Sequence, residues 1–333
     1  MNDSKPRHFG RRIAAALIFL AIMSAGIWAA FNRQFIIDQF TVWQYDMPRA
    51  VAALVSDGGM NEHGEFLFRA SRPELNDRAN FNKNCAMRER QAIILGCYAG
   101  SRIYIFDVTD ARVSGVRTVT AAHEMLHAAY ERLGVGERRQ VDEMLKKQLA
   151  RTTDQELLDL VKIYAQTEPG QELNELHSLF ATEVADLSPE LENYYKKYFV
   201  DRSKVVQVYQ KYHQVFADLD ARAAELKRQL EIKNAEIAAT MAQYQTDMNA
   251  LSSDIDEFNR CAQTLNCFAS QAAFGQARAK LIARQNALKS VANQINTQIK
   301  QYNTGVAELN ALGIEAQKLN QSIDSHAPSL APE

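Results

Sequence analysis

The chain lacks an excess of charge of either sign. Its 333 residues carry 38 Lys and Arg against 40 Asp and Glu, which gives a formal net charge of -2 at pH 7. Domains that bind nucleic acid usually carry a strongly basic face and a high isoelectric point. The overall charge therefore does not point to nucleic acid, and we expect none as a partner.

Proline and glycine are absent over a long stretch. The sequence has neither residue between Pro189 and Gly275, although both punctuate the preceding part of the body. Because proline breaks helices and glycine weakens them, this absence is typical of very long helices. We therefore divide the body near residue 200.

An uncharged apolar run lies close to the N-terminus. It extends from Ile13 to Phe31 and follows a cluster of four basic residues, Lys5, Arg7, Arg11 and Arg12. A helix over residues 13–31 would rise about 28 Å, which is close to the thickness of a bilayer core. Positive charge before such a run holds the N-terminus in the cytoplasm.

This pattern predicts a protein of the cell membrane that crosses the bilayer once. Residues 1–12 are then cytoplasmic, residues 13–31 form the transmembrane anchor, and the body is periplasmic or extracellular. A cleavable signal peptide is the alternative, with Ser24-Ala25-Gly26 as its small-residue cleavage site.

Cysteine is scarce, and no two cysteines form a CxxC pair. The four are Cys85, Cys97, Cys261 and Cys267, so a structural zinc ribbon is not expected. An even number outside the cytoplasm favours disulfides, and four cysteines allow three pairings. We favour the two local pairs, Cys85–Cys97 and Cys261–Cys267. Four reduced, buried thiols are the alternative.

The first part of the body, residues 32–200, has the pattern of an α+β domain. Val, Ile, Tyr and Phe dominate two segments on either side of a glycine-containing turn, which predicts strands over 92–98 and 102–108. After Val116 the pattern predicts helices over 118–133, 136–149, 154–166, 171–186 and 189–199. A small sheet followed by several helices is an α+β arrangement.

The first of these helices carries the segment His123-Glu124-Met125-Leu126-His127. Residues four apart lie on one face of an α-helix, so both imidazoles can point at one position. Zn²⁺ accepts imidazole nitrogen, and Glu124 lies one position round the helix, where it can take a proton from a metal-bound water. The segment predicts one Zn²⁺ per chain, with Glu124 as the general base. Two partly exposed histidines on an ordinary helix are the alternative.

An HExxH helix that follows a strand resembles the zincin metallopeptidases. The resemblance covers residues 60–200 and implies a fold in which the substrate lies as an added strand along the edge of the sheet. By this resemblance the segment SRIYIFDV, residues 101–108, is the candidate edge strand. The metzincin continuation HExxHxxGxxH is absent, because Ala128, Ala129, Tyr130 and Glu131 follow His127.

A third metal ligand is implied by another zincin subgroup, the gluzincins. These proteins take a Glu from a later helix, often in the pattern ExxSD or ExxAD. Here Glu175 is followed three positions later by Ser178, but Leu179 stands where the pattern has Asp. That departure puts the usual second carboxylate in doubt. By this resemblance Glu175 is the expected third ligand, with Glu172 and Glu183 as alternatives.

The second part of the body, residues 201–325, carries two apolar seams. The first runs from Leu219 to Phe258 and the second from Leu288 to Leu309. Apolar positions recur in steps of three and four, which is the heptad spacing of a coiled coil. We expect an antiparallel helical hairpin with Cys261–Cys267 at its tip. Two helices in an intermolecular coil are the alternative, and residues 326–333 are expected to be a disordered tail.

These features predict a membrane-anchored zinc metallopeptidase that hydrolyses peptide bonds outside the cytoplasm. Its substrate would be a peptide or a protein, and the hairpin would bind a substrate, a protein partner or a second copy of the chain. The alternative is a non-catalytic, membrane-anchored coiled-coil scaffold with a vestigial protease domain. The intact His, Glu, His set favours the enzyme, because a vestigial site has no need to keep the Glu.

Overall fold

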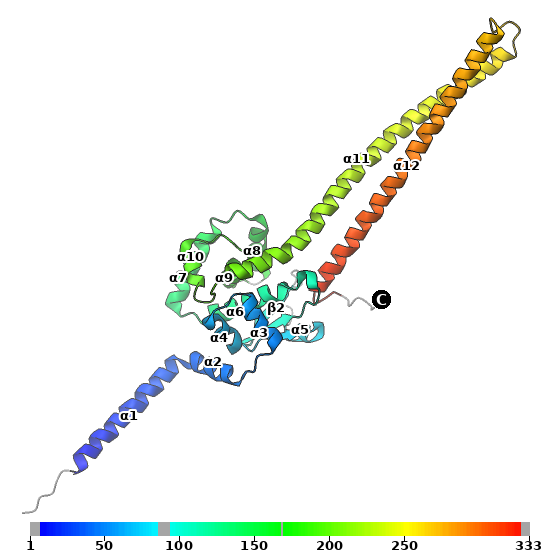
Figure 1. The fold of residues 1–333 in the computed structure, drawn as a ribbon. Helices are drawn as coiled ribbons and strands as arrows, with labels where there is room; N and C mark the ends of the chain where they lie inside the picture. Colours follow the sequence, from blue (N-terminus) through cyan, green and yellow to red (C-terminus); the bar gives the residue numbers. More distant parts are fainter. Residues whose placement is uncertain (1–6, 86–93, 168, 328–333) are drawn as a thin grey trace, which may run out of the picture. The chain divides into compact units, whose positions relative to one another are not determined.

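The structure is a computed structural model that describes residues 7–85, 94–167 and 169–327. The chain divides into two compact units, Met1–Val215 with Asn320–Glu333, and Phe216–Leu319. The described residues are mostly helical and include one three-stranded sheet (Figure 1). The predicted α+β class is therefore confirmed at this level.

An apolar helix, α1 (Arg7–Phe31), begins the described chain. Its segment Arg11–Phe31 is long and apolar enough to cross a membrane, and its most apolar window has no buried residue. Length and composition thus fit the predicted anchor. The orientation of the chain and the compartment of its body stay predictions.

Four short helices and one strand lie between the apolar helix and the rest of the sheet. They are α2 (Arg33–Gln44), α3 (Arg49–Asp57), α4 (Glu62–Ala70), β1 (Glu74–Asn76) and α5 (Arg78–Asn84). Local caps begin two of the helices: the Asn61 side chain accepts from the backbone N–H groups of His63 and Gly64, and that of Asp77 accepts from Asn80. Such side chains satisfy N–H groups that a helix leaves unpaired at its start.

The sheet has the strand order β1-β3-β2, with β2 at Gly96–Ala99 and β3 at Arg102–Phe106. The central strand β3 runs parallel to β1 and antiparallel to β2, and its Ile103 and Ile105 are fully buried. The expectation that residues 101–108 form an edge strand was therefore wrong. The reason is β1, which pairs with the side of β3 that was expected to be free.

Five helices follow the sheet at the positions where five were predicted. They are α6 (Val116–Glu131), α7 (Val135–Leu149), α8 (Gln155–Thr167), α9 (Glu172–Thr182) and α10 (Pro189–Tyr195). Helices α6 and α9 pack closely together, with Ala121 and Ala122 of α6 and Leu176 and Phe180 of α9 in the same buried core. This packing brings the face of α6 that carries the histidines next to α9.

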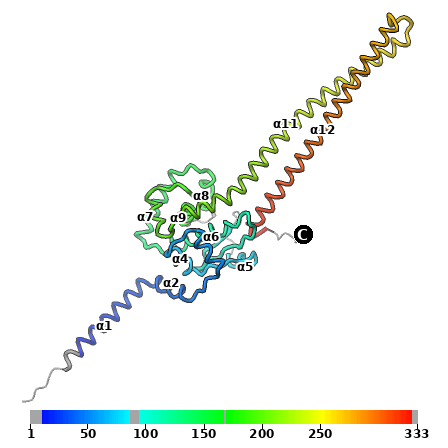
Figure 2. Tube along the Cα trace, viewed as in Figure 1, coloured from blue at the N-terminus to red at the C-terminus, as the bar shows by residue number. Residues whose placement is uncertain are grey.

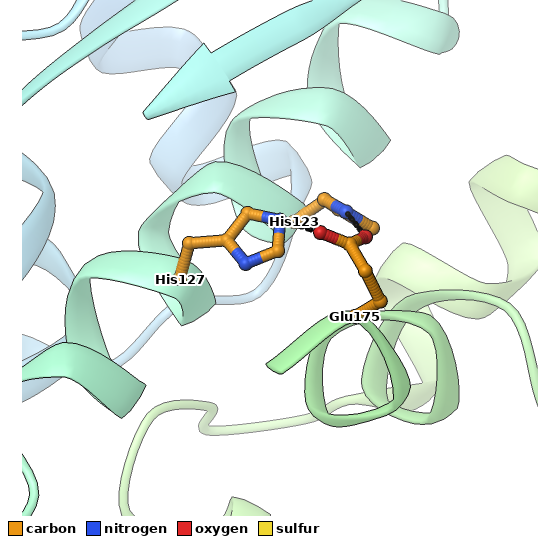
Figure 3. Close-up of side chains that lie close together, drawn as sticks. All are labelled: His123, His127 and Glu175. Atoms are coloured by element: carbon orange, nitrogen blue, oxygen red, sulfur yellow. Dashed lines mark ion pairs between the residues drawn. The ribbon is translucent and has the colours of Figure 1, made fainter. Parts of the chain in front are cut away.

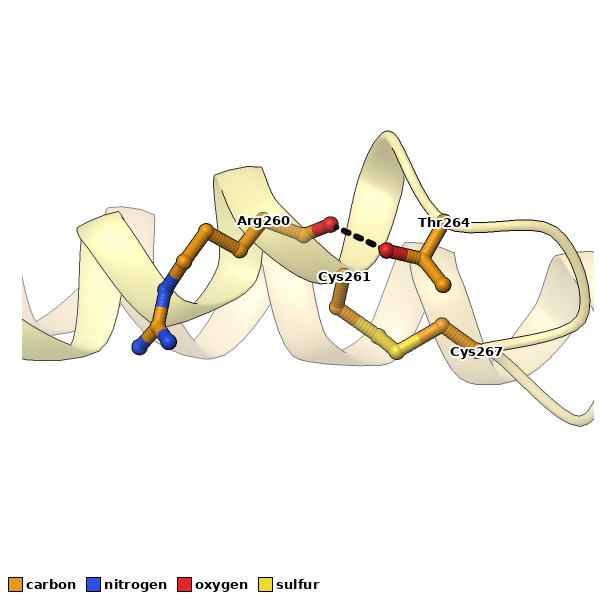
Figure 4. The surroundings of a disulfide bond; sticks show 4 residues. All are labelled: Arg260, Cys261, Thr264 and Cys267. Carbon is orange, nitrogen blue, oxygen red and sulfur yellow. Dashed lines mark hydrogen bonds between the residues drawn. A yellow bond between two sulfur atoms is a disulfide. The ribbon is translucent and has the colours of Figure 1, made fainter.

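Both predicted local cysteine pairs form disulfides. The first, Cys85–Cys97, joins the C-terminal end of α5 to β2, with 5.9 Å between the Cα atoms. The second, Cys261–Cys267, has a Cα–Cα distance of 5.3 Å. It closes the connection after α11 (Ser203–Ala262), where Thr264 also donates a hydrogen bond to the Arg260 carbonyl (Figure 4).

The second unit consists of most of α11 and most of α12 (Gln271–Ile323). Asp254 of α11 forms an ion pair with Arg284 of α12, and Leu230 of α11 lies beside Gly305 of α12. An earlier position in one helix thus meets a later position in the other, so the two run antiparallel, as the trace in Figure 2 shows. A coiled-coil geometry for this pair stays a prediction.

Candidate metal centre

Two helices bring the three predicted ligands together. His123 and His127 project from one face of α6, as their spacing requires, with 4.7 Å between the ring centroids. Glu175 comes from the first turn of α9. The Nε2 atom of His123 lies 3.5 Å from one carboxylate oxygen of Glu175, and Nε2 of His127 lies 3.4 Å from the other (Figure 3).

This group could hold a metal ion. One ligand atom from each of His123, His127 and Glu175 can be chosen so that all three lie within 4.8 Å of one another. Two donors that each lie about 2.0–2.1 Å from a tetrahedral ion are about 3.3–3.4 Å apart. The two nitrogen–oxygen distances are close to that value, and both are longer than the ~2.7–2.9 Å of a charged hydrogen bond.

The electrostatics of the group favour an ionised Glu175. Burial raises the pKa of its carboxyl, but its interactions with His127 and His123 outweigh burial, so the net pKa is lowered. A metal binds the deprotonated form of a carboxylate. Glu175 is therefore in its ligating form at neutral pH.

The other ring nitrogen of His127 is held by α9. Its Nδ1 lies 3.1 Å from Oδ1 of Asn174 and 3.4 Å from Oγ of Ser178. An amide oxygen only accepts, so Nδ1 carries the proton and Nε2 keeps its lone pair for the site. Leu179, which stands where the gluzincin pattern has Asp, is buried in the core. Asn174, and not residue 179, is therefore a side chain that contacts Nδ1 of His127.

Asn174 was not predicted from the sequence. One signal could have found it: Asn174 and Ser178 are four positions apart on the predicted helix, and Glu175 follows Asn174 directly. Residues at this spacing share a helix face. A polar pair beside the expected ligand is a candidate for orienting a histidine.

The predicted general base, Glu124, is buried next to β2 rather than within the group of three. Gly96 of β2 makes room for it: a Cβ atom on Gly96 would lie 2.6 Å from Oε1 of Glu124 and 2.4 Å from Cγ2 of Thr120. Any larger residue at position 96 would displace the carboxylate. Glu124 thus follows His123 directly on α6, and its side chain lies against β2.

The two alternative ligands lie elsewhere. Oε2 of Glu172 accepts from the backbone N–H of Gly170 at 2.9 Å, and this hydrogen bond lowers its pKa. Glu183 ends α9 and forms a hydrogen bond with Tyr209 of α11, and burial raises its pKa to about 7. Of the three glutamates, the structure brings only Glu175 to the histidine pair.

A further histidine, His177 of α9, has a structural role. His177 is fully buried, and its Nε2 lies 2.9 Å from the Tyr194 hydroxyl. Burial lowers its pKa to about 3, so the imidazole is neutral at physiological pH. As its position two residues after Glu175 predicted, it does not join the group.

No protein family, curated protein or solved structure matches this chain. The candidate centre therefore stands on the sequence motif and on the geometry of its residues.

Proposed function

We propose that the chain is a membrane-anchored zinc metallopeptidase of zincin-like fold that cleaves peptides outside the cytoplasm. The observation that carries the proposal is the group formed by His123, His127 and Glu175. The Nε2 atoms of His123 and His127 lie 3.5 and 3.4 Å from the two carboxylate oxygens, and one ligand atom from each side chain lies within 4.8 Å of the other two. Two histidines and one glutamate are also a donor set found in catalytic zinc sites.

The residues of the chain divide the chemistry between them. His123, His127 and Glu175 would hold the Zn²⁺, which would supply a Lewis acid and a water of lowered pKa. Glu124, which follows the first ligand on α6, accepts the proton of the attacking water and passes it to the leaving amine. Asn174 holds His127 in the tautomer that keeps Nε2 for the metal.

The substrate would be an extended peptide or a segment of a protein. Among the described residues, β2 pairs with β3 on one side only. A peptide added along the open side of β2 would gain backbone hydrogen bonds. Because Gly96 of β2 lies against Glu124, such a peptide would pass beside the general base.

The hairpin of α11 and α12, which we expect to be a coiled coil, would bind a substrate or a protein partner. Its connection presents Leu265, which is 94% exposed, beside the disulfide Cys261–Cys267. Three rings, Phe258, Phe268 and Phe274, pack together behind it with centroids 5.2–5.4 Å apart. A rigid end with an exposed apolar side chain supports this role.

The test compares metal content and peptide cleavage in the purified full-length chain. Wild type should carry about one zinc per chain and cleave a peptide library, and Glu124→Gln should keep the metal while turnover falls by about 10²-fold or more. Glu172→Gln is the matched control, since its carboxylate lies outside the group, and it should cleave normally. Zinc without cleavage in the wild type would favour the scaffold, and a fully active Glu124→Gln would refute the mechanism.

A further inference from the structure

The helix α2 is polar on its buried side and apolar on its exposed side. Asp38 and Thr41 are buried, with only 3% and 6% of their surfaces exposed. Ile36, Phe40 and Trp43 are 40%, 55% and 80% exposed. A surface helix of a soluble domain shows the opposite pattern, with its apolar stripe facing the core.

The exposed side forms one continuous stripe. Ile36, Phe40 and Trp43 follow at steps of four and three, so they lie on one face of the helix. The rings of Phe40 and Trp43 are in contact, with centroids 5.9 Å apart. Single exposed apolar residues are normal, whereas a stripe of three adjoining large apolar side chains marks a surface that interacts with a protein or a membrane.

The buried side prevents α2 from rotating to hide this stripe. The Asp38 carboxylate accepts from Nε of Arg132 at 2.8 Å and from Nη2 at 2.9 Å, and also from the Gln34 amide at 2.9 Å. Arg132 is the residue that ends α6, and it donates further to the Tyr98 hydroxyl and the Ala128 carbonyl. The two-pronged contact of a buried Arg with a carboxylate fixes direction as well as distance.

The position of α2 in the chain indicates what covers the stripe. The apolar helix α1 ends at Phe31, and α2 begins at Arg33. The backbone N–H of Asn32 donates to the Trp28 carbonyl, and the Asn32 carbonyl accepts from the N–H of Ile36, so Asn32 alone, with φ -108° and ψ 22°, separates the two helices. The stripe therefore lies where the chain leaves the membrane that α1 is proposed to cross.

We propose that the stripe of Ile36, Phe40 and Trp43 lies in the membrane interface, between the lipid headgroups and the acyl chains. Aromatic residues, Trp above all, favour this zone, and an amphipathic helix lies there with its apolar face in the lipid. The inference rests on the anchor role of α1 in the proposed function. Because Arg132 joins Asp38 to the end of α6, the helix that carries His123 and His127 is then held close to the membrane surface.

Tryptophan fluorescence of the full-length chain in phosphatidylcholine–phosphatidylglycerol vesicles tests the proposal, because the sequence has only two tryptophans. Trp28→Phe leaves Trp43 as the sole emitter. Its emission should be quenched by lipids brominated near the headgroup, more than by lipids brominated near the chain end, and it should be shielded from acrylamide in the water. Adding Phe40→Gln should reduce the quenching by lipid and increase that by acrylamide.

Two matched variants calibrate this result. Trp28→Phe/Trp43→Phe/Phe19→Trp places the sole emitter in the middle of Arg11–Phe31, where deep bromine labels should quench it most. Trp28→Phe/Trp43→Phe/Val200→Trp places it at a position 79% exposed on the domain, where acrylamide should quench it freely. Both should keep the same metal content as the wild type.

Each outcome decides the proposal. Quenching of Trp43 by acrylamide and not by lipid would overturn it, and shielding from both quenchers would overturn it in favour of a protein surface, such as a second copy. If Phe19→Trp shows no quenching by lipid, the anchor fails and the inference fails with it. Failure of the peptidase chemistry is separate, because Glu124→Gln should leave every fluorescence result unchanged.

Discussion

Asp38 and Glu175 are both buried carboxylates, 3% and 7% exposed, and each faces nitrogen atoms from α6 or from the residue that ends it. The Asp38 oxygens lie 2.8 and 2.9 Å from the Arg132 guanidinium. The Glu175 oxygens lie 3.4 and 3.5 Å from the imidazole nitrogens of His127 and His123. The contacts are thus short in one region and longer in the other. We call Asp38 and Arg132 the closed pair, and His123, His127 and Glu175 the open group.

The difference separates a structural ion pair from a group that could hold a metal ion. A buried charge is costly unless short hydrogen bonds compensate it, and Asp38 has three of them. Glu175 faces its nitrogens at a distance that is long for a hydrogen bond and suitable for two ligands of one ion. We therefore expect substitutions at Asp38 to lower stability and substitutions around Glu175 to lower metal affinity.

The largest expected effect is loss of the metal from the open group. His127→Ala removes one of three protein ligands, so metal analysis of the purified chain should find little or no zinc where the wild type holds about one ion. Glu175→Ala should also weaken binding strongly, whereas Glu172→Ala, the matched control on the same helix, should retain the ion. A chain that keeps zinc in Glu175→Ala and loses it in Glu172→Ala would show that the ligand assignment is wrong.

A smaller effect is expected at the closed pair. Asp38→Ala leaves the Arg132 charge buried without its carboxylate, which typically costs about 3–5 kcal/mol of unfolding free energy. Urea unfolding of the full-length chain in detergent measures this loss, while zinc per folded chain should not change.

A double substitution, Asp38→Leu with Arg132→Met, is the control for that prediction. It removes both charges together and should recover much of the lost stability. A single Asp38→Ala chain as stable as the wild type would mean that the Asp38–Arg132 pair does not hold α2 in place.

Glu183 adds a third case to the comparison, a half-buried carboxyl with a Tyr209 hydrogen bond and a pKa raised by burial to about 7. Since the ordinary value is 4.5, the folded state holds this proton more tightly than the unfolded state does. Its contribution to stability is therefore complete below about pH 4.5 and is lost as the pH rises to about 7. Between pH 5 and pH 8 the metal-free wild type should lose about 2–3 kcal/mol relative to Glu183→Gln.

Unfolding with urea at both pH values, in the presence of a chelator, measures this difference. Glu190→Gln, which changes an exposed carboxylate and keeps Glu183, should show the same dependence on pH as the wild type. If the difference in unfolding free energy between the wild type and Glu183→Gln is the same at both pH values, the raised pKa is contradicted.

The sequence predicted the elements that repeat a pattern over many residues. The helices α6 to α10 and the long helices α11 and α12 carry sustained periodicity, and the two disulfides join cysteines that are near in sequence. The His123 and His127 pair was also predictable, because a single helix sets its geometry. Local rules were sufficient for these features.

Features that depend on contacts between distant segments were not predictable. The strand β1 has only three residues, too few to show an alternating pattern, and its pairing with β3 decided which strands lie at the edges. The helix α2 has its apolar side outward, so the usual rule for a core-facing helix does not describe it. The contact between Asn174 and His127 depends on how α9 packs against α6, which no single segment encodes.

The smallest expected effect concerns that contact. Asn174→Ala removes the nearer of the two oxygens that contact His127 Nδ1 and should weaken zinc binding by about 10–100-fold, the usual result of losing a partner that orients a histidine ligand. Competition with a chromophoric chelator at pH 7 measures the affinity, and urea unfolding of the metal-free chain checks that stability is little changed. Asn174→Asp keeps an acceptor at the same position and should bind zinc at least as tightly as the wild type. If Asn174→Ala binds as tightly as Asn174→Asp, the amide of Asn174 does not orient the ring of His127, and Ser178 is then the remaining contact of α9 with Nδ1.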